Sequence, residues 1–228
     1  MKLTAFLPCR KGSERVPNKN TRPFGGHAGG LLAIKLGQLL AVEAIDAIVV
    51  SSNDPVVLDG AQALGHPKVR IHSRADHLGS SQTSTDALVG HAVELIPEGH
   101  ILWTHVTSPF FGARDYARCI EQYLDGLARG HDSLMSVTTL QTFLWSEQGP
   151  LNYDRSVEKW PRTQTLPPLY EVNSAAFLHS ADGYRRLGDR IGAKPGLYAT
   201  GKVAGFDIDW PEDFELAQAM LERGIATC

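Results

Sequence analysis

The sequence predicts a doubly wound α/β fold built on a mostly parallel sheet. Apolar runs without polar alternation, such as Leu3–Leu7 and Ala47–Val50, are typical of strands that are buried on both faces. A segment with helical periodicity, Leu31–Val42, separates these two runs, and the alternation of strand and helix continues along most of the 228 residues. We therefore expect a single domain over residues 1–228, with a ligand at the carboxyl ends of its strands.

The other predicted elements keep this alternation. Asp54 and Pro55 are typical of an N-cap followed by the first helical residue, and Gly65 ends that helix about three turns later. The remaining predicted strands and helices are, in chain order, Val69–His72, Ser84–Ile96 (helix), Ile101–Thr104, Ala113–Ala128 (helix), Ser133–Thr138, Ser174–Leu178 and a last helix from Pro211 to about Arg223.

The alternation fails over residues 139–172. This stretch contains four prolines and two tryptophans, and it has little helical periodicity. A long excursion with exposed aromatic side chains is typical of a functional or partner-binding segment. We therefore expect an arm inserted in the domain.

Composition excludes several classes of protein. Lys and Arg total 22 against 25 Asp and Glu, so the net charge of −3 offers no general attraction for nucleic acid. No apolar run approaches the roughly 20 residues that span a bilayer, and the first apolar stretch is too short for a signal peptide. The three scattered cysteines favour free thiols over a disulfide framework. These observations predict a cytoplasmic protein with no nucleic-acid or membrane partner.

The loop after the first strand is the most informative segment. Residues 10–20 place four cations and a glycine directly after that strand, and such a turn is suited to wrap a polyphosphate. The loop lacks the P-loop motif, and Gly25–Gly30 does not fit the dinucleotide fingerprint, which disfavours a nicotinamide oxidoreductase. Composition alone also allows a solvated basic loop.

Leu7–Asn20, LPCRKGSERVPNKN, closely resembles the N-terminal signature of the acylneuraminate cytidylyltransferase (CMP-sialic acid synthetase) family. Further matching segments follow in family order: Val49–Asp54, Arg74–Leu78, Thr107–Pro109, Arg162–Tyr170, Asn173 and Asp207–Asp209. The resemblance implies a Rossmann-like sheet with an arm at 139–172 for dimerisation. It also implies transfer of CMP from CTP to the anomeric hydroxyl of a sialic-acid-like sugar, with Mg²⁺ as cofactor and pyrophosphate as the second product.

The resemblance also suggests nucleotide-binding residues. Its nucleotide set is Arg10, Lys11, Gly12, Ser13, Arg15, Lys19, Asn20, Arg74 and Ser81, with Arg10 and Lys19 also catalytic. Cationic side chains offset phosphate charge, whereas a base edge needs directional polar partners such as Asn20 and Arg74. Without the resemblance, Arg74 fits equally well as a surface residue paired with Asp76. The turn that contains Ser81 fits equally well as a helix N-cap.

Asp207 and Asp209 are the predicted metal ligands. Carboxylates two residues apart in an extended segment point the same way and can share one hard cation. The alternative is that Asp209 complements the N-terminus of the last helix. The family resemblance favours magnesium, and it makes both residues catalytic.

The predicted sugar-binding residues are His105, Arg162, Gln164, Asn173 and Phe177. His105 ends a predicted strand where sialate-activating members usually have Gln, and it fits a structural role equally well. Arg162 is the only cation among Arg162, Gln164 and Asn173, and should therefore contact the sugar carboxylate. The competing interpretation pairs Arg162 with Glu158 or Glu171.

Three positions depart from the family pattern. Glu14 stands where many members have a phosphate-contacting Lys, Glu171 where Arg is frequent, and Phe177 where Tyr is common. Two alternatives therefore stay open. One is a cytidylyltransferase for another acidic ketose, such as legionaminic, pseudaminic or 3-deoxy-octulosonic acid. The other is a catalytically dead nucleotide-binding homologue.

Overall fold

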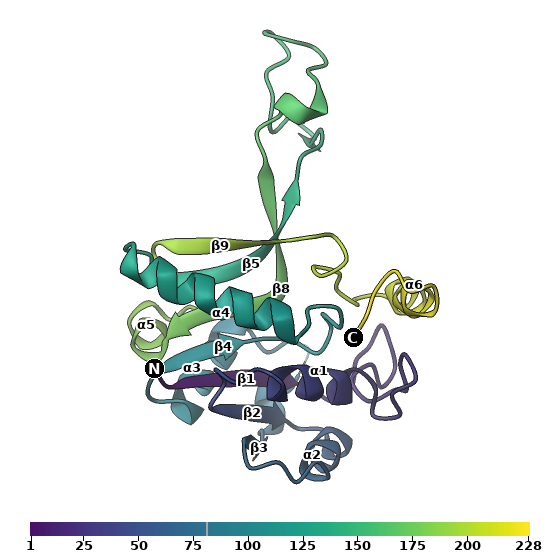
Figure 1. The fold of residues 1–228 in the computed structure, drawn as a ribbon, viewed down its shortest axis with the longest axis vertical. Coiled ribbons are helices and arrows are strands. Elements are labelled where there is room, and N and C mark those ends of the chain that lie inside the picture. Colours follow the sequence, from purple (N-terminus) through teal and green to yellow (C-terminus); the bar gives the residue numbers. More distant parts are fainter. Residues whose placement is uncertain (81) are drawn as a thin grey trace.

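A computed structural model describes residues 1–80 and 82–228. Across these residues the main sheet has seven strands in the order β3-β2-β1-β4-β8-β5-β9 (Figure 1). Their bounds are β1 Leu3–Cys9, β2 Ala47–Ser52, β3 Val69–Ser73, β4 His100–Trp103, β5 Ser133–Leu140, β8 Leu169–Ser180 and β9 Pro195–Thr200. Strand β8 runs antiparallel to β4 and β5, while the other described pairs in this sheet are parallel. The prediction of a mostly parallel, doubly wound sheet is confirmed.

Helices cover both faces of the sheet. One buried apolar cluster includes side chains of α1 (Gly30–Leu40), α2 (Pro55–Gln62), α4 (Ala113–Ala128) and α6 (Pro211–Glu222). The other includes side chains of α3 (Thr85–Leu95) and α5 (Ala181–Leu187). Short 3₁₀ turns lie at Asp76–Leu78 and Thr163–Thr165. Figure 1 shows α1 and α4 on the nearer face.

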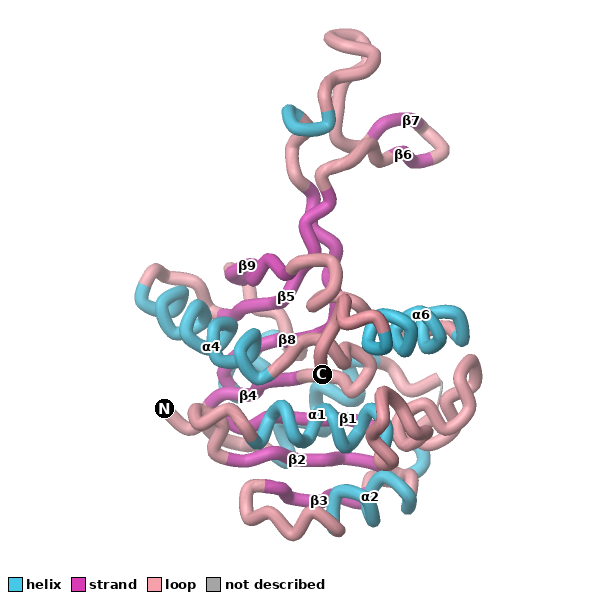
Figure 2. Tube along the Cα trace, turned by 45° about the vertical axis from the view of Figure 1, so that its right-hand side comes forward, coloured by secondary structure: helices cyan, strands magenta, loops and turns pink. Residues whose placement is uncertain are grey.

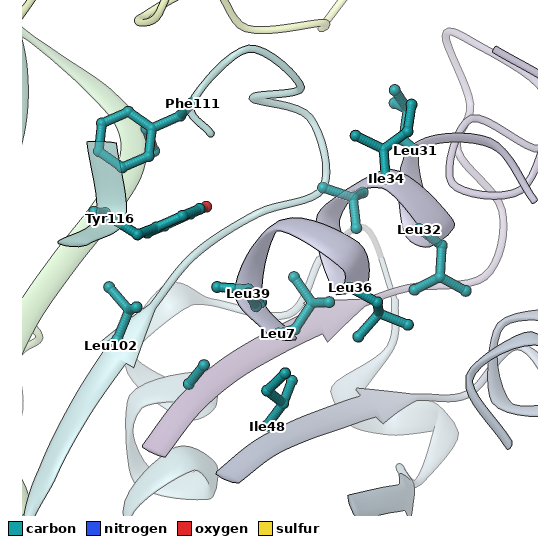
Figure 3. Packing of buried hydrophobic residues seen from close by; sticks show 14 of the residues in the cluster. Leu7, Leu31, Leu32, Ile34, Leu36, Leu39, Ile48, Leu102, Phe111 and Tyr116 are labelled. Carbon is teal, nitrogen blue, oxygen red and sulfur yellow. The ribbon is translucent and has the colours of Figure 1, made fainter. Parts of the chain in front are cut away.

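Strand β1 shows why its residues form a doubly buried strand. Leu3, Ala5 and Leu7 belong to the buried cluster that includes α1, in which Figure 3 shows Leu7, whereas Phe6 belongs to the opposite cluster. There the Phe6 ring meets the edge of Trp103, with ring centroids 4.9 Å apart. Alternate side chains of a strand face opposite sides, so a continuous apolar run is stable only where both faces are covered.

The helix boundaries largely follow the local signals. The predicted N-caps are present, since the Asp54 carboxylate accepts a hydrogen bond from the Val56 amide at 3.0 Å and Ser84 caps α3. Among the helices and the strands of the main sheet, α5 and β9 were not predicted. Helix α5 has only seven residues, and β9 begins at Pro195 on the edge of the sheet, where a proline is tolerated but weakens the strand signal.

An arm projects from the body of the molecule (Figures 1 and 2). Its stalk consists of the ends of β5 and β8, in which Thr139 pairs with Tyr170 and Leu140 with Leu169. Residues 141–168 form the head, which contains a small hairpin of β6 (Trp145–Ser146) and β7 (Gly149–Pro150). The arm predicted at 139–172 therefore includes the paired ends of β5 and β8 as well as the head.

Two smaller expectations concern helices and thiols. In the part of the chain that the structure describes, no helix is long and apolar enough to cross a membrane. Cys9 and Cys119 are buried free thiols, and Cys228 is an exposed one. The cysteines thus have the free state that their odd number predicts.

Candidate active site

A cavity of about 430 Å³ opens at the carboxyl ends of β1 and β4. From β1 the sheet continues to β2 and β3 in one direction, and β4 is the neighbour of β1 in the other direction. The order of the strands therefore reverses at β1. This is the position where open α/β sheets bind their ligands. The predicted site residues that line it are Arg10, Ser13, Arg15, Lys19, Asn20, Arg74, His105, Asp207 and Asp209.

The first loop is shaped by two residues with left-handed backbone. Gly12 has φ of +73°, and Asn18 has φ of +53°, which asparagine adopts more readily than most residues. Val16 anchors the loop in the core, with 1% of its surface exposed. The Lys11 amide donates to Asn53 Oδ1 at 2.9 Å. Lys11 and Gly12 therefore shape the loop but do not line the cavity. The other predicted residues of this loop do line it.

Cations of this loop face the carboxylates of the 207–209 segment. Arg15 Nη2 lies 3.1 Å and Lys19 Nζ 3.8 Å from Asp209 Oδ1, and Lys19 Nζ also donates to the Ile208 carbonyl at 2.7 Å. Burial lowers the pKa of Lys19, and the two nearby carboxylates oppose that shift. The Arg15 and Asp209 side chains are about half exposed, so their pair adds little stability and can open for an anionic ligand.

Asp207 is a mostly buried carboxylate. Burial raises its pKa, Asp209 adds to that rise, and a hydrogen bond with Thr107 opposes it. Its Oδ1 atom is buried and has no hydrogen-bond partner among the described residues. A buried, unpartnered carboxylate oxygen beside a second carboxylate fits a hard cation that arrives with an anionic substrate.

Asp213, and not Asp209, caps the N-terminus of α6. Asp213 Oδ2 accepts hydrogen bonds from the Asp209 amide at 3.0 Å and from the Trp210 amide at 2.7 Å, so Asp213 caps α6. The Asp209 side chain instead points to Arg15, whose guanidinium also lies over the Trp210 ring at 4.6 Å.

Arg74 is buried at the far end of the cavity. Only 4% of its surface is exposed, and its Nη2 donates to the Cys9 carbonyl at 2.9 Å. Its Nε and Nη1 have no partner among the described residues, and burial lowers its pKa. Among the described residues Arg74 forms no ion pair with Asp76, which instead accepts a hydrogen bond from Asn53 at 3.1 Å. Asn20 donates to the Arg10 carbonyl at 3.2 Å on the same side.

His105 presents a defined tautomer. Trp103 Nε1 donates to His105 Nε2 at 2.9 Å, and an indole N–H can only donate, so Nε2 is unprotonated and the proton lies on Nδ1. Burial lowers the pKa of His105 to about 3, and the cations Arg190, Lys19 and Lys35 contribute to the shift. His105 is therefore neutral at physiological pH and keeps one N–H to donate.

The other predicted sugar-binding residues lie outside this cavity. Phe177 is fully buried in the core beneath the Arg190 guanidinium, 3.9 Å from its ring centroid. Asn173 Nδ2 donates to Thr138 and Thr200. Arg162 and Gln164 are exposed on the arm, and within the described chain Arg162 forms no ion pair with Glu158 or Glu171. Ser81 lies outside the described residues.

The comparison with family models decides the family. Residues 4–225 match the model named cytidylyltransferase. This chain belongs to the cytidylyltransferase family. Two curated pseudaminic acid cytidylyltransferases, from Campylobacter jejuni strains 81-176 and NCTC 11168, are 25% and 24% identical to it over 230 residues, which is 96% of each chain.

Solved structures show the same fold. The cytidylyltransferase is similar to CMP:2-keto-3-deoxy-manno-octonic acid synthetase complexed with CTP, with a TM-score of 0.70 and 18% identity over 98% of this chain and 100% of the other. It is also similar to 4-diphosphocytidyl-2C-methyl-D-erythritol synthase of Anaerococcus prevotii, with a TM-score of 0.65 and 14% identity over 97% and 96% of the two chains.

Several residues in the cytidylyltransferase cavity were not predicted as ligands. These are Glu14, Ser80, Thr83, Thr107 and Ser174. The hydroxyl-rich turn that includes Ser80 and Thr83 was visible in the sequence, and their side chains bond each other at 3.0 Å. Ser174 carried no such signal, since its place depends on an irregularity of β8.

A buried lysine supports one wall of the same cavity. Lys35 of α1 donates to the Ser108 and Phe111 carbonyls and to the Tyr116 hydroxyl, at 2.8, 3.1 and 2.8 Å. These bonds hold the segment after β4, which includes Thr107, against α1 and α4. Burial lowers the pKa of Lys35 to about 7. No sequence motif marks this residue, because an apolar helix face gives no sign of the acceptors above it.

Proposed function

We propose that this protein transfers CMP from CTP to the anomeric hydroxyl of an acidic nine-carbon 2-keto sugar. The observation that carries the proposal is the cavity at the switch point, where the loop cations Arg15 and Lys19 lie against Asp209 and the unpartnered donors of Arg74 line the same space. Family membership supports the nucleotide, and the names of the curated relatives make pseudaminic acid the first acceptor to test. N-acetylneuraminate, legionaminic acid and 3-deoxy-octulosonic acid are the alternatives.

The reaction exchanges a phosphoanhydride bond of CTP for a new phosphate ester bond to the sugar. The anomeric oxygen of the acceptor forms a bond to the α-phosphorus, the bond from that phosphorus to the β-phosphate oxygen breaks, and the hydroxyl proton leaves to solvent. Arg10, Ser13 and Lys19 hold the triphosphate through donors that match its oxygens. Lys19 already faces two acceptors, so a phosphate oxygen can replace either one of them.

Magnesium fits the two carboxylates of this cavity. The described residues contain no cluster of three potential metal ligands, and Mg²⁺ is usually held by one or two carboxylates together with substrate phosphates. Asp207 and Asp209 would hold it, with the unpartnered Asp207 Oδ1 as the first ligand. When bound, the ion would neutralise charge on the phosphates.

The base lies, in this proposal, at the end of the cavity formed by Arg74 and Asn20. Two guanidinium nitrogens of Arg74 have no described partner, and a buried donor left unpaired is costly. Cytosine presents two adjacent acceptors, O2 and N3, to such donors, whereas N3 of uracil carries a proton and adenine has no adjacent pair of acceptors. We therefore expect a preference for CTP over UTP and ATP.

The arm supplies the second part of the proposal. Its head exposes apolar side chains, of which Trp145, Val157 and Trp160 are 52%, 85% and 65% exposed. We propose that it packs on a second copy of the chain and brings Arg162 and Gln164 to the cavity of that copy. The three free thiols favour the reducing cytoplasm as the location of this dimer.

Pyrophosphate release tests the proposed function. Purified protein is incubated with CTP, Mg²⁺ and each of the four acidic sugars, and UTP and ATP replace CTP in parallel reactions. We expect release with CTP and at least one sugar. No release with any sugar, together with a higher melting temperature in CTP, would favour the dead nucleotide-binding homologue. Equal release with UTP would overturn the base assignment.

A further inference from the structure

Ser174 has an unusual backbone conformation at the cavity wall. Its φ is +54°, in the left-handed region, which residues other than glycine, asparagine and aspartate adopt rarely and at a cost. Ser174 also lines the cavity. A strained residue that persists at a binding cavity indicates that the surrounding structure holds it there.

The local strand register explains how the strain is imposed. Met135 of β5 pairs with Phe177 of β8, and Val137 pairs with Val172, so Ser136 on β5 faces the whole of residues 173–176 on β8. The extra length of β8 forms a bulge, and bulges redirect side chains beside active sites. Here the redirected side chain is that of Ser174.

Hydrogen bonds on both sides of Ser174 keep this bulge in place. Before it, Asn173 Nδ2 donates to Thr138 Oγ1 at 3.0 Å and to Thr200 Oγ1 at 2.8 Å, which joins β8 to both β5 and β9. After it, the Ala176 amide donates to Ser136 Oγ at 2.8 Å. A Cβ added to Gly205 would lie only 2.5–2.7 Å from three side-chain atoms of the Asn173 group, so this packing requires glycine.

Ser174 itself is left with an available hydroxyl. Among the residues that the structure describes, no backbone or side-chain group forms a hydrogen bond with the Ser174 hydroxyl, and this oxygen is not buried. The Asn173 side chain and the Ala176 amide, in contrast, form hydrogen bonds within the protein. The bulge therefore presents one hydroxyl, held by a rigid frame, to the cavity.

The position of Ser174 indicates which substrate it meets. Thr104 Oγ1 donates to the Ala175 carbonyl at 2.7 Å, so Ser174 lies beside His105 at the β4–β8 side of the cavity. Arg74 follows β3, and its guanidinium reaches the Cys9 carbonyl at the end of β1, which β4 separates from β8. Under the proposed function, the base occupies the Arg74 side, and the acceptor sugar occupies the β4–β8 side.

We propose that Ser174 is a specificity-determining residue for the acceptor, whose hydroxyl bonds a polar oxygen of the sugar beside the His105 Nδ1–H. This inference rests on the proposed function and adds a ligand from within the same chain to the acceptor side. Together the two groups are neutral hydrogen-bonding partners, suited to a hydroxyl or an amide oxygen rather than to the carboxylate.

Three variants test it. Ser174→Gly removes the hydroxyl and the strain, Ser174→Ala removes the hydroxyl and keeps the Cβ, and Ser136→Ala weakens the frame without removing a cavity group. We expect both Ser174 variants to raise the KM for the accepted sugar by about 2- to 10-fold, with the KM for CTP unchanged. The melting temperature should be higher for Ser174→Gly than for Ser174→Ala. Ser136→Ala should lower it and, because Ser174 keeps its hydroxyl in a weakened frame, should raise the sugar KM by less than either Ser174 variant does.

The outcomes separate the inference from the function on which it rests. If Ser174→Gly raises the melting temperature while both KM values stay at their wild-type level, Ser174 is only a strained structural residue and the inference is wrong. If the CTP KM rises instead of the sugar KM, Ser174 belongs to the nucleotide side. If the wild-type protein releases no pyrophosphate with any acidic sugar, the proposed function itself fails.

Discussion

Replacing His105 with glutamine should make the stability of the protein less sensitive to acid. In the folded protein the pKa of His105 is lowered to about 3, first by burial and then by the cations Arg190, Lys19 and Lys35. The Trp103 N–H also points at His105 Nε2 from 2.9 Å, so a proton on that nitrogen would break the hydrogen bond. The unfolded chain, in contrast, protonates this imidazole near its ordinary value of 6.5.

The magnitude follows from linkage. Because the folded pKa is depressed, the unfolded state binds more protons than the folded state between pH 6.5 and about pH 3, and stability falls as the pH falls through this window. For one group with these two pKa values, the free energy of unfolding decreases by about 2 kcal/mol between pH 7 and pH 5. The partial exposure of His105 makes this an upper value.

Urea unfolding of wild type and His105→Gln near pH 7 and near pH 5 measures the effect. Glutamine keeps an oxygen acceptor for Trp103 but does not titrate, so the loss on acidification should be smaller in the variant by up to about 2 kcal/mol. His27→Gln, which removes an exposed loop imidazole, is the matched control and should behave as wild type. An equal loss in wild type and His105→Gln would refute the tautomer and the burial argument together.

Three further predictions concern the proposed site and the arm. Asp207→Asn should reduce pyrophosphate release by at least about 100-fold without lowering the melting temperature, because burial already disfavours the charged carboxylate; near-normal release would remove Asp207 from the metal site. Arg162→Ala should raise the sugar KM by about 10- to 100-fold and leave the CTP KM unchanged, and an unaltered sugar KM would contradict the carboxylate contact. Wild type should sediment as a dimer at micromolar concentration, and the double variant Trp145→Ala/Trp160→Ala should sediment as a monomer. Val56→Ala, which changes an exposed apolar residue of α2, is the control and should remain a dimer. A wild-type monomer would exclude a dimerisation arm.

Much of the sheet was predictable because its strands are buried on both faces. Helices cover both faces of β1 and β2, so most residues of these strands are apolar. Such continuous apolar runs can be identified from the local sequence alone. The antiparallel direction of β8 was not predicted from its composition. It follows from the connection, because the chain between β5 and β8 has no crossover helix, and two adjacent strands joined without a crossover form a hairpin. The proline-rich, non-helical segment between the two strands could therefore have predicted that β8 is antiparallel to β5.

The side of the cavity that we propose holds the nucleotide was also predictable to a large extent. Arg10, Ser13, Lys19 and Asn20 lie within one short loop, so a single motif identifies them, and all four line the cavity. Arg74 was ambiguous in the sequence because Asp76 is a plausible local partner. The structure resolves that ambiguity through burial, since a guanidinium that is 4% exposed cannot remain in a surface ion pair.

The side that we propose holds the acceptor was harder to predict because its geometry is assembled from distant segments. The His105 tautomer depends on a hydrogen bond from Trp103, and the place of Ser174 depends on how β5, β8 and β9 are joined through Asn173. Neither feature has a local sequence signal, since a serine is an unremarkable residue until its φ is positive. The same strand, β8, forms the arm stalk and the bulge. A substitution that shifts the stalk should therefore alter acceptor recognition before it alters nucleotide binding, because Arg74 and the first loop are attached to other strands.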